Sequence, residues 1–332
     1  MRNIIIVFLL ILSLYSDDEY QLGEGIQVSS SPLPLYLGGY FSIDYKSMDE
    51  ADRYRIDDLA FMGYGAYKNF SYIAEVEFKE FYVQNRVENN TVITRDQHLY
   101  IERLYVDYNF NENYLVRVGK FNSAVGYWNL LPINVLRETT SSPVSTEILF
   151  PKFTTGIGAS HTSYTDNEIK IDLMLQNNSD VDDEYNNYKI DRHYGLGISY
   201  AKDDLTYKVN VGFFHKVIDH NIYPDNLYYL LLSTKYEKDN YQFLAELGSQ
   251  MSYYKFTTSY AGYIQGLYRF TQKHIGVIRL ESYDDIARDT SDQMAIFAYT
   301  YRPLYPVALK GEYQLHSHSE KNQFLFSFSV LF

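Results

Sequence analysis

The chain has 332 residues, a formal net charge of −13 and no cysteine, and it contains 36 Tyr and 20 Phe beside a single Trp. The absence of Cys excludes a disulfide scaffold, thiolate metal sites and cysteine nucleophiles. The Lys and Arg residues are scattered singly, which together with the acidic balance excludes a nucleic-acid-binding role, because that role needs a basic surface. The aromatic excess favours many strands that end at membrane interfaces.

The first residues are typical of a secretory signal peptide. Arg2 precedes an apolar run from Ile4 to Leu14, which ends near the small residue Ser16. A transmembrane helix needs about 20 apolar residues, so this run is too short to span a bilayer comfortably. We therefore expect residues 1–16 to be removed as a signal peptide. No later segment is long and apolar enough to be a membrane helix, so any membrane signal must be dispersed over strands.

From about residue 35 onward, apolar and polar residues alternate with the period of two that marks a β-strand. In the segment from Glu168 to Gln176 the Ile and Leu side chains fall on one face, and Lys170 and Asp172 fall on the other. The last segment alternates in the same way and ends at Phe332. Sixteen such segments are predicted: 35–46, 55–66, 70–82, 98–109, 114–125, 154–165, 168–178, 192–202, 205–217, 226–237, 240–252, 257–270, 273–283, 292–302, 306–316 and 321–332.

The connections between these segments predict a closed, all-β transmembrane antiparallel barrel of about 16 strands. Tight polar turns such as Lys68-Asn69 and Lys202-Asp204 alternate with longer loops, as in bacterial barrels with short periplasmic turns and long outward loops. A secreted β-sandwich is the alternative, but its strands average five or six residues, whereas these run near ten. We expect a periplasmic N-terminal segment at residues 17–34 and the barrel at residues 35–332.

The polar faces of the predicted strands should point into the barrel and line a water-filled pore. The expected pore-lining residues are Lys79, Arg103, Arg117, Lys170, Lys208, Arg279, Lys310, Glu75, Glu77, Asp107, Asp172 and Glu312. The same polar faces also carry Arg269, Asp44, Glu246 and Glu281. The expected pore lining therefore has eight basic and eight acidic residues. We expect most of these charges to pair across neighbouring strands and stiffen the wall, and only a few to touch solutes.

The longest connection, from Gly126 to Lys152, is the third outward loop and is expected to fold inward and narrow the channel. Structureless loops longer than about 12–15 residues usually have a function, and this one carries apolar residues that need burial. The residues assigned to the constriction are Trp128, Asn129, Arg137, Glu138 and Glu147. A lid on the outer surface remains the alternative.

Three stretches carry a resemblance to a known family. The strand pair and loop entry of phosphate-selective porins and related outer-membrane channels are resembled by Leu99–Tyr108 with Tyr114–Phe121, followed by Gly126–Asn129. Pro143 and the stretch Phe150–Gly156 are similar to the exit of that loop. The resemblance implies a sixteen-stranded, trimeric, passive porin whose third loop constricts the pore. It does not carry phosphate selectivity over, because the family's basic ladder is replaced here by balanced charge.

We therefore predict an outer-membrane porin for the passive diffusion of small hydrophilic solutes and ions. A substrate-selective porin for anions or phosphate is the alternative, and a barrel enzyme or adhesin is a further one. Acidic pairs such as Asp284-Asp285, and Asp219-His220, lie in outward loops but resemble barrel proteases through dipeptides alone. We expect no catalytic residue, metal site or cofactor. The expected partners are outer-membrane lipids, lipopolysaccharide, small solutes and two further copies of the chain in a homotrimer.

Overall fold

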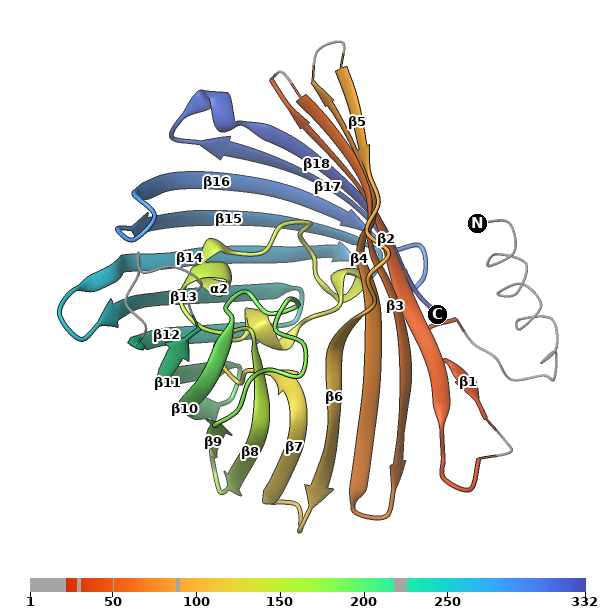
Figure 1. Cartoon of the computed structure of the whole chain (residues 1–332), viewed down its shortest axis with the longest axis vertical. Helices are drawn as coiled ribbons and strands as arrows, with labels where there is room; N and C mark the ends of the chain where they lie inside the picture. The colour runs from red at the N-terminus through yellow and green to blue at the C-terminus, as the bar shows by residue number, and fades with distance from the viewer. Residues whose placement is uncertain (1–21, 29–30, 50, 88–89, 218–225) are drawn as a thin grey trace.

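The computed structural model describes residues 22–28, 31–49, 51–87, 90–217 and 226–332. These residues form one antiparallel sheet that curves around residues 123–152 (Figure 1). The expected signal peptide and the dipeptide Asp219-His220 lie outside the described residues. No helix in the described ranges is both long and apolar enough to cross a membrane.

The elements follow one another along the chain almost entirely as strands. The strands are β1 (Ile26–Gln27), β2 (Tyr36–Met48), β3 (Ala51–Tyr67), β4 (Phe70–Val87), β5 (Asn90–Thr94), β6 (Tyr100–Asn109), β7 (Tyr114–Asn122), β8 (Phe153–Tyr164), β9 (Glu168–Gln176), β10 (Ile190–Lys202), β11 (Leu205–Lys216), β12 (Asn226–Lys238), β13 (Tyr241–Ser252), β14 (Phe256–Thr271), β15 (His274–Asp285), β16 (Thr290–Tyr301), β17 (Val307–His316) and β18 (Gln323–Leu331). The short helices are η1 (Trp128–Leu130), η2 (Asn134–Leu136), α2 (Val144–Ile148) and η3 (Ser319–Lys321).

The sheet closes on itself. Each strand of the wall pairs antiparallel with the strands before and after it in the chain, including β9 with β10. The last strand, β18, pairs with β2 and so completes the ring. Two of the described strands, β1 and β5, are short additions to β2 and β4, which leaves sixteen strands in the wall. The predicted sixteen-stranded antiparallel barrel is therefore confirmed, and closure leaves no exposed sheet edge in the wall.

Tight turns connect the strands at one rim. Lys68, Asp203 and Asp239 take φ values of 54°, 50° and 49° in the two-residue turns after β3, β10 and β12. Left-handed residues at such positions match the twist of the flanking strands, and Asp tolerates this conformation better than most residues. The long connections, including residues 123–152, all leave from the opposite ends of the strands.

Two strands extend further than their sequence pattern predicts. The pattern gives 55–66 and 70–82, whereas β3 begins at Ala51 and β4 continues to Val87, where it pairs with β5. This extension rises above the rest of the wall in Figure 1. Where both faces of a hairpin meet water, polar residues occupy both faces, so the alternation that marks a strand disappears.

The two faces of the wall have opposite polarity. On β15, the inward side chains of Arg279 and Glu281 are buried, whereas Ile278 and Leu280 are 54% and 57% exposed on the outer surface. Aromatic residues gather at the strand ends of the outer surface, as in the pair Tyr241–Tyr268, whose rings lie 4.8 Å apart. Apolar side chains outside and charged side chains inside are the reverse of the distribution in a water-soluble domain.

The N-terminal segment is fastened to one end of the barrel. β1 pairs with β2, and the Tyr64 and Tyr72 hydroxyls donate hydrogen bonds of 2.5 and 2.6 Å to the carbonyl oxygens of Glu24 and Pro34. The segment thus lies at the rim that carries the tight turns.

Candidate functional site

The segment between β7 and β8, residues 123–152, lies within the ring of strands in Figure 1 and carries η1, η2 and α2. Most of its apolar side chains are buried against inward residues of the wall, whereas Leu130 and Leu131 are 44% and 40% exposed. Leu149 and Phe150 join a cluster with Phe214 and Leu231, and Ile133 and Val135 join another with Tyr40, Ala60 and Met62. We call this segment the internal loop.

Inward carboxylates of the wall accept hydrogen bonds from the backbone of the internal loop. Glu246 on β13 accepts from the Tyr127 N–H, and Glu281 on β15 accepts from the Val144 N–H. Glu312 on β17 accepts from the N–H groups of Thr140 and Ser141 at 2.8 and 3.1 Å, and from the Ser141 hydroxyl. These strands lie across the barrel from β7, where the loop begins, so the loop spans the interior.

Inward cations donate to the same loop's carbonyl oxygens. Lys208 donates to Gly126 at 3.0 Å, Arg279 donates to Ser141 at 3.1 Å, and Arg302 donates to Val135 at 2.7 Å. Lys310 donates to both the backbone and the side-chain oxygen of Asn134. A buried cation without such partners would be severely destabilised, so these hydrogen bonds offset the cost of removing the charges from water.

This arrangement corrects part of the expected pore lining. Lys208, Lys310 and Glu312 face inward as their alternation predicts, but they are buried beneath the internal loop and bind it. Arg279 is likewise fully buried, although it touches the edge of a cavity. The pattern of one strand cannot show that a distant loop will cover its inner face.

The other expected lining residues form pairs along the wall. Arg103 pairs with Glu75, and Arg117 binds both oxygens of Asp107 at 2.7 and 2.8 Å. The Lys170 ammonium lies 3.1 Å from the Asp172 carboxylate, which also accepts a hydrogen bond of 2.6 Å from the Ser160 hydroxyl. Such pairs across and along strands stiffen the wall more than they offer charge to a solute.

A cavity of about 760 Å³ remains between the internal loop and the inner faces of β2, β3, β4 and β15–β18. Eight acids and eight bases touch it. The acids are Asp44, Asp57, Asp58, Glu77, Glu102, Glu147, Glu281 and Asp292, and the bases are Lys46, Arg53, Arg55, Lys79, Arg137, Lys152, Arg279 and Lys321. The numbers of acids and bases at this cavity are therefore equal. Of the charged residues expected to face the pore, the cavity contains Asp44, Glu77, Glu281, Lys79 and Arg279.

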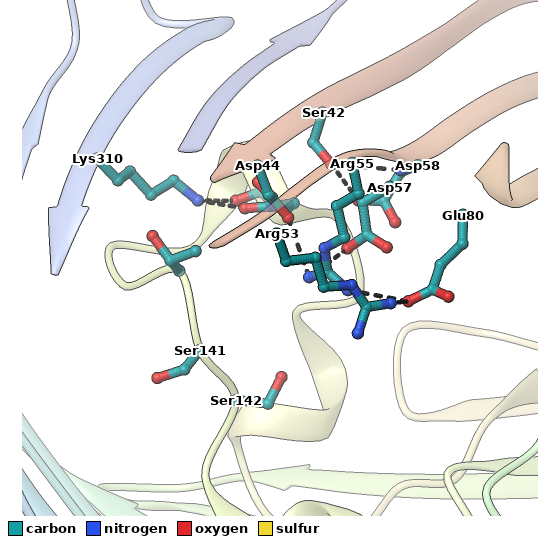
Figure 2. A network of polar contacts seen from close by, with 12 residues as sticks. Ser42, Asp44, Arg53, Arg55, Asp57, Asp58, Glu80, Ser141, Ser142 and Lys310 are labelled. Atoms are coloured by element: carbon teal, nitrogen blue, oxygen red, sulfur yellow. Dashed lines mark hydrogen bonds and ion pairs between the residues drawn. The ribbon is translucent and has the colours of Figure 1, made fainter. Parts of the chain in front are cut away.

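On one side of the cavity the charges neutralise one another. Figure 2 shows Arg55 between Asp44, Asp57 and Glu80, at distances of 3.0, 2.8 and 3.2 Å. Arg53 also pairs with Glu80. Sequence alternation missed most of this network because β-bulges near Phe41 and Ile56 break the period of two and bring both Asp57 and Asp58 inward.

A second group of missed residues joins two carboxylates to two tyrosines. The Tyr40 hydroxyl donates to Glu102 at 2.7 Å and lies 3.5 Å from Glu77, which also accepts from the Tyr185 hydroxyl. Tyr185 comes from the connection between β9 and β10, so no local pattern could have placed it here. Burial and the charges of Glu102 and Glu77 raise the pKa of Tyr185, which therefore stays a hydrogen-bond donor at neutral pH.

The residues assigned to the constriction occupy different positions. The Asn129 amide closes the base of the loop by donating to the carbonyl oxygens of Ser123 and Lys152 at 2.8 and 2.9 Å. Trp128 is buried, and the Arg137 guanidinium lies 5.7 Å from its ring. The position of Glu147 beside Lys152 also puts it at the cavity.

Arg137 and Glu138 point to different partners despite their adjacency. Arg137 touches the cavity and donates to the Leu131 carbonyl, whereas the Glu138 carboxylate lies 3.1 Å from Arg302 on the wall. Only Arg137 of this pair faces the open space.

A smaller cavity of about 270 Å³ lies between the internal loop and the turn side of the barrel, lined by β6–β9. Arg117, Lys170 and Asp172 touch it, and Asn122 touches both cavities. The internal loop thus separates two polar spaces inside one barrel.

Within the described ranges, no group of three or more His, Asp or Glu residues is arranged to hold a metal ion. Asp284 accepts from the Ser259 hydroxyl at 2.8 Å, and Asp285 pairs with Arg288 at 2.8 Å. Both acids are thus engaged in structural contacts.

No protein-family model and no curated protein matches the sequence. Solved structures do match the fold. The outer-membrane channel DcaP of Acinetobacter baumannii is 12% identical with a TM-score of 0.58, over 93% of this chain and 99% of that one. OmpF of Salmonella typhi is 9% identical with a TM-score of 0.61, over 92% and 100%. An anion-selective porin from Comamonas acidovorans is 10% identical with a TM-score of 0.57, over 90% and 99%. The chain therefore has the sixteen-stranded barrel fold of these outer-membrane proteins over nearly its whole length.

Proposed function

We propose that the chain is an outer-membrane porin, a water-filled channel for the passive diffusion of small hydrophilic solutes and ions. The observation that carries this proposal is the reversed polarity of the closed barrel, with apolar side chains outside and a charged cavity inside. The charged interior needs water around it, and the exposed apolar band needs lipid. The porins with the same fold support this reading.

The proposal includes the surroundings of the barrel. Outer-membrane lipids would cover the apolar band, and lipopolysaccharide would meet its outward rim. A homotrimer, as the resemblance to phosphate-selective porins implies, would bury part of the band between copies.

Selectivity between small anions and cations should be slight, because eight acids balance eight bases around the larger cavity. This observation favours general diffusion over the alternative of an anion- or phosphate-selective porin.

Recording from the purified mature chain in a planar bilayer tests the proposal. We expect stepwise conductance increments and, under a salt gradient, a reversal potential close to zero. A protein that is folded by its mobility on gels but gives no conductance steps would overturn the proposed function.

A further inference from the structure

The charges around the larger cavity are paired unevenly. Arg55 has three carboxylates around it, and Arg279 has Glu281 at 3.3 Å. In contrast, Glu77 and Glu102 have tyrosine hydroxyls as partners and no cation within ion-pair distance among the described residues. Charges without an opposite partner are the ones that a solute can use.

Glu77 and Glu102 form an acidic pole that is short of hydrogen-bond donors. They are only 1% and 3% exposed, and both touch the cavity. The Oε1 atom of Glu77 is buried and accepts no hydrogen bond from any described residue. A buried carboxylate oxygen without a donor is destabilising, and an ammonium group supplies three donors with the complementary charge.

Lys79, Arg137 and Lys152 form a basic pole at the same cavity. Burial lowers the pKa of Lys152, and the charges of Arg137 and Lys79 add to this effect against the opposing charge of Glu147. Glu147 is the carboxylate that pairs with Lys152, and no described carboxylate lies within 4 Å of the Lys79 or Arg137 charge. Arg and Lys side chains in this arrangement bind carboxylates through charge-assisted hydrogen bonds.

Tyr185 lies between the two poles. Its hydroxyl donates to Glu77, and its ring lies 5.4 Å from the Lys79 ammonium. Phe153 packs on it with ring centroids 5.4 Å apart, so an apolar surface separates the opposite charges. The two poles therefore face one cavity with a tyrosine ring between them.

We propose that this cavity binds small zwitterions of the amino-acid or short-peptide class, with the ammonium at Glu77 and Glu102 and the carboxylate at Lys79 and Arg137. The inference rests on the proposed function, because the solute reaches the cavity through the pore. The cavity of about 760 Å³ has room for such a solute with its water.

Block of the ion current through single channels tests the proposal with four probes of similar size. Glycylglycine is the zwitterion, N-acetylglycylglycine the anion, glycylglycine ethyl ester the cation and N-acetylglycinamide the neutral probe. In the parent protein we expect glycylglycine to give a saturable block at the lowest concentration. Equal block by all four probes, or a stronger block by the anion or the cation alone, would overturn the inference.

Two variants separate the poles. Glu77→Gln and Lys79→Gln should each weaken glycylglycine block about tenfold, the loss expected for one charge-assisted hydrogen bond. The preference should also switch, toward the anionic probe in Glu77→Gln and toward the cationic probe in Lys79→Gln. Glu320→Gln and Lys238→Gln are matched controls, because their exposed side chains lie away from the cavity, and they should leave the block unchanged.

The outcomes distinguish the inference from the function on which it rests. If the parent gives no conductance steps, both fail, whereas conductance without a preference for the zwitterion overturns only the inference. Lys79 is exposed, so Lys79→Gln should fold even if the buried Glu77 does not tolerate replacement. A Lys79→Gln protein with unchanged block of all four probes would contradict the proposed site.

Discussion

Single charged residues inside this barrel are stabilised largely by the backbone of the internal loop. Lys310 is fully buried, yet its ammonium donates to two oxygens of Asn134. Glu312 is 1% exposed and accepts three hydrogen bonds from Thr140 and Ser141. Removal of either charge from water is costly, so each side chain holds its loop contact firmly.

Glu312→Ala should loosen the internal loop without opening the barrel. It removes a carboxylate that satisfies two partly buried backbone N–H groups, and each buried group left unsatisfied costs up to about 1–3 kcal/mol. We expect the heat-induced mobility transition on gels to occur at a lower temperature, and the open-channel current to become noisier. Glu320→Ala, at an exposed side chain, is the control. A transition temperature equal to the parent's would show that Glu312 does not anchor the loop.

Arg137 and Glu138 should respond differently to neutralisation although they are adjacent. Arg137→Gln removes a charge that touches the cavity and should shift the ion preference toward cations. Glu138→Gln weakens the 3.1 Å contact with Arg302 and should lower stability by about 1–3 kcal/mol while changing selectivity little. Reversal potentials under a salt gradient and thermal transitions measure the two effects. A clear shift toward anions in Glu138→Gln would contradict the placement of its carboxylate at the wall.

At the scale of the element, the internal loop is held in place by contacts with several strands of the wall. Its backbone is bound by side chains of β11, β13, β15 and β17, and apolar residues such as Leu149 and Val135 pack in two clusters on the wall. Because contacts on several strands hold the loop at once, we expect the loss of one contact to loosen the loop near that contact and to leave the other contacts in place.

Replacement of residues 127–150 by a short Gly-Ser linker should widen the channel. The loop separates the two cavities, so its removal joins them and shortens the narrow part of the passage. We expect single-channel conductance to rise at least about twofold, because the width of the constriction limits ion flow. The unheated and heated mobilities on gels must still differ, which shows that the variant folds. A folded variant that conducts no better than the parent would show that the loop does not restrict the passage.

Strand positions were the part of the fold that sequence could predict best. The predicted segment 168–178 corresponds to β9, and the predicted segment 205–217 corresponds to β11. One face of each strand lies on the apolar outer surface and the other faces polar groups inside the barrel, so apolar and polar residues alternate clearly in the sequence. Residues 51–54 of β3 and 83–87 of β4 escaped prediction because polar residues occupy consecutive positions there, which removes the alternation. The bulge between Ile56 and Asp58 also escaped, since a bulge shifts the register without a distinct residue signature.

The candidate site was predicted only where it depends on one strand. Alternation gives the inward direction of Glu77 and Lys79, but not the Tyr185 hydroxyl that reaches Glu77 from a loop 108 positions away. Likewise, the burial of Lys208 and Lys310 follows from where the internal loop lies. Contacts between distant segments are set by the closure of the whole barrel, which a local pattern does not contain.

For the whole molecule, the net charge of −13 is a poor guide to the interior. The larger cavity is balanced, whereas exposed acids such as Glu320 and Asp183 lie in outward connections. Charges beyond about 8–10 Å from the ion path are screened at physiological salt. The acidic excess should therefore affect conduction at low salt alone.

The mature chain should behave as a heat-modifiable outer-membrane barrel. Closure depends on the pairing of β18 with β2, and the N–H of Phe332 donates to the Gly39 carbonyl at 2.7 Å while its own carbonyl accepts from the Gly39 N–H at 2.8 Å. We expect the chain in the outer-membrane fraction, with a faster mobility on gels before boiling than after it. Truncation of residues 323–332 should abolish this shift, because the open edges of β2 and β17 would leave unpaired backbone groups in lipid. Glu320→Gln leaves the ring intact and should keep the shift. Recovery of the full chain as a soluble periplasmic protein without a shift would contradict both the membrane location and the porin function.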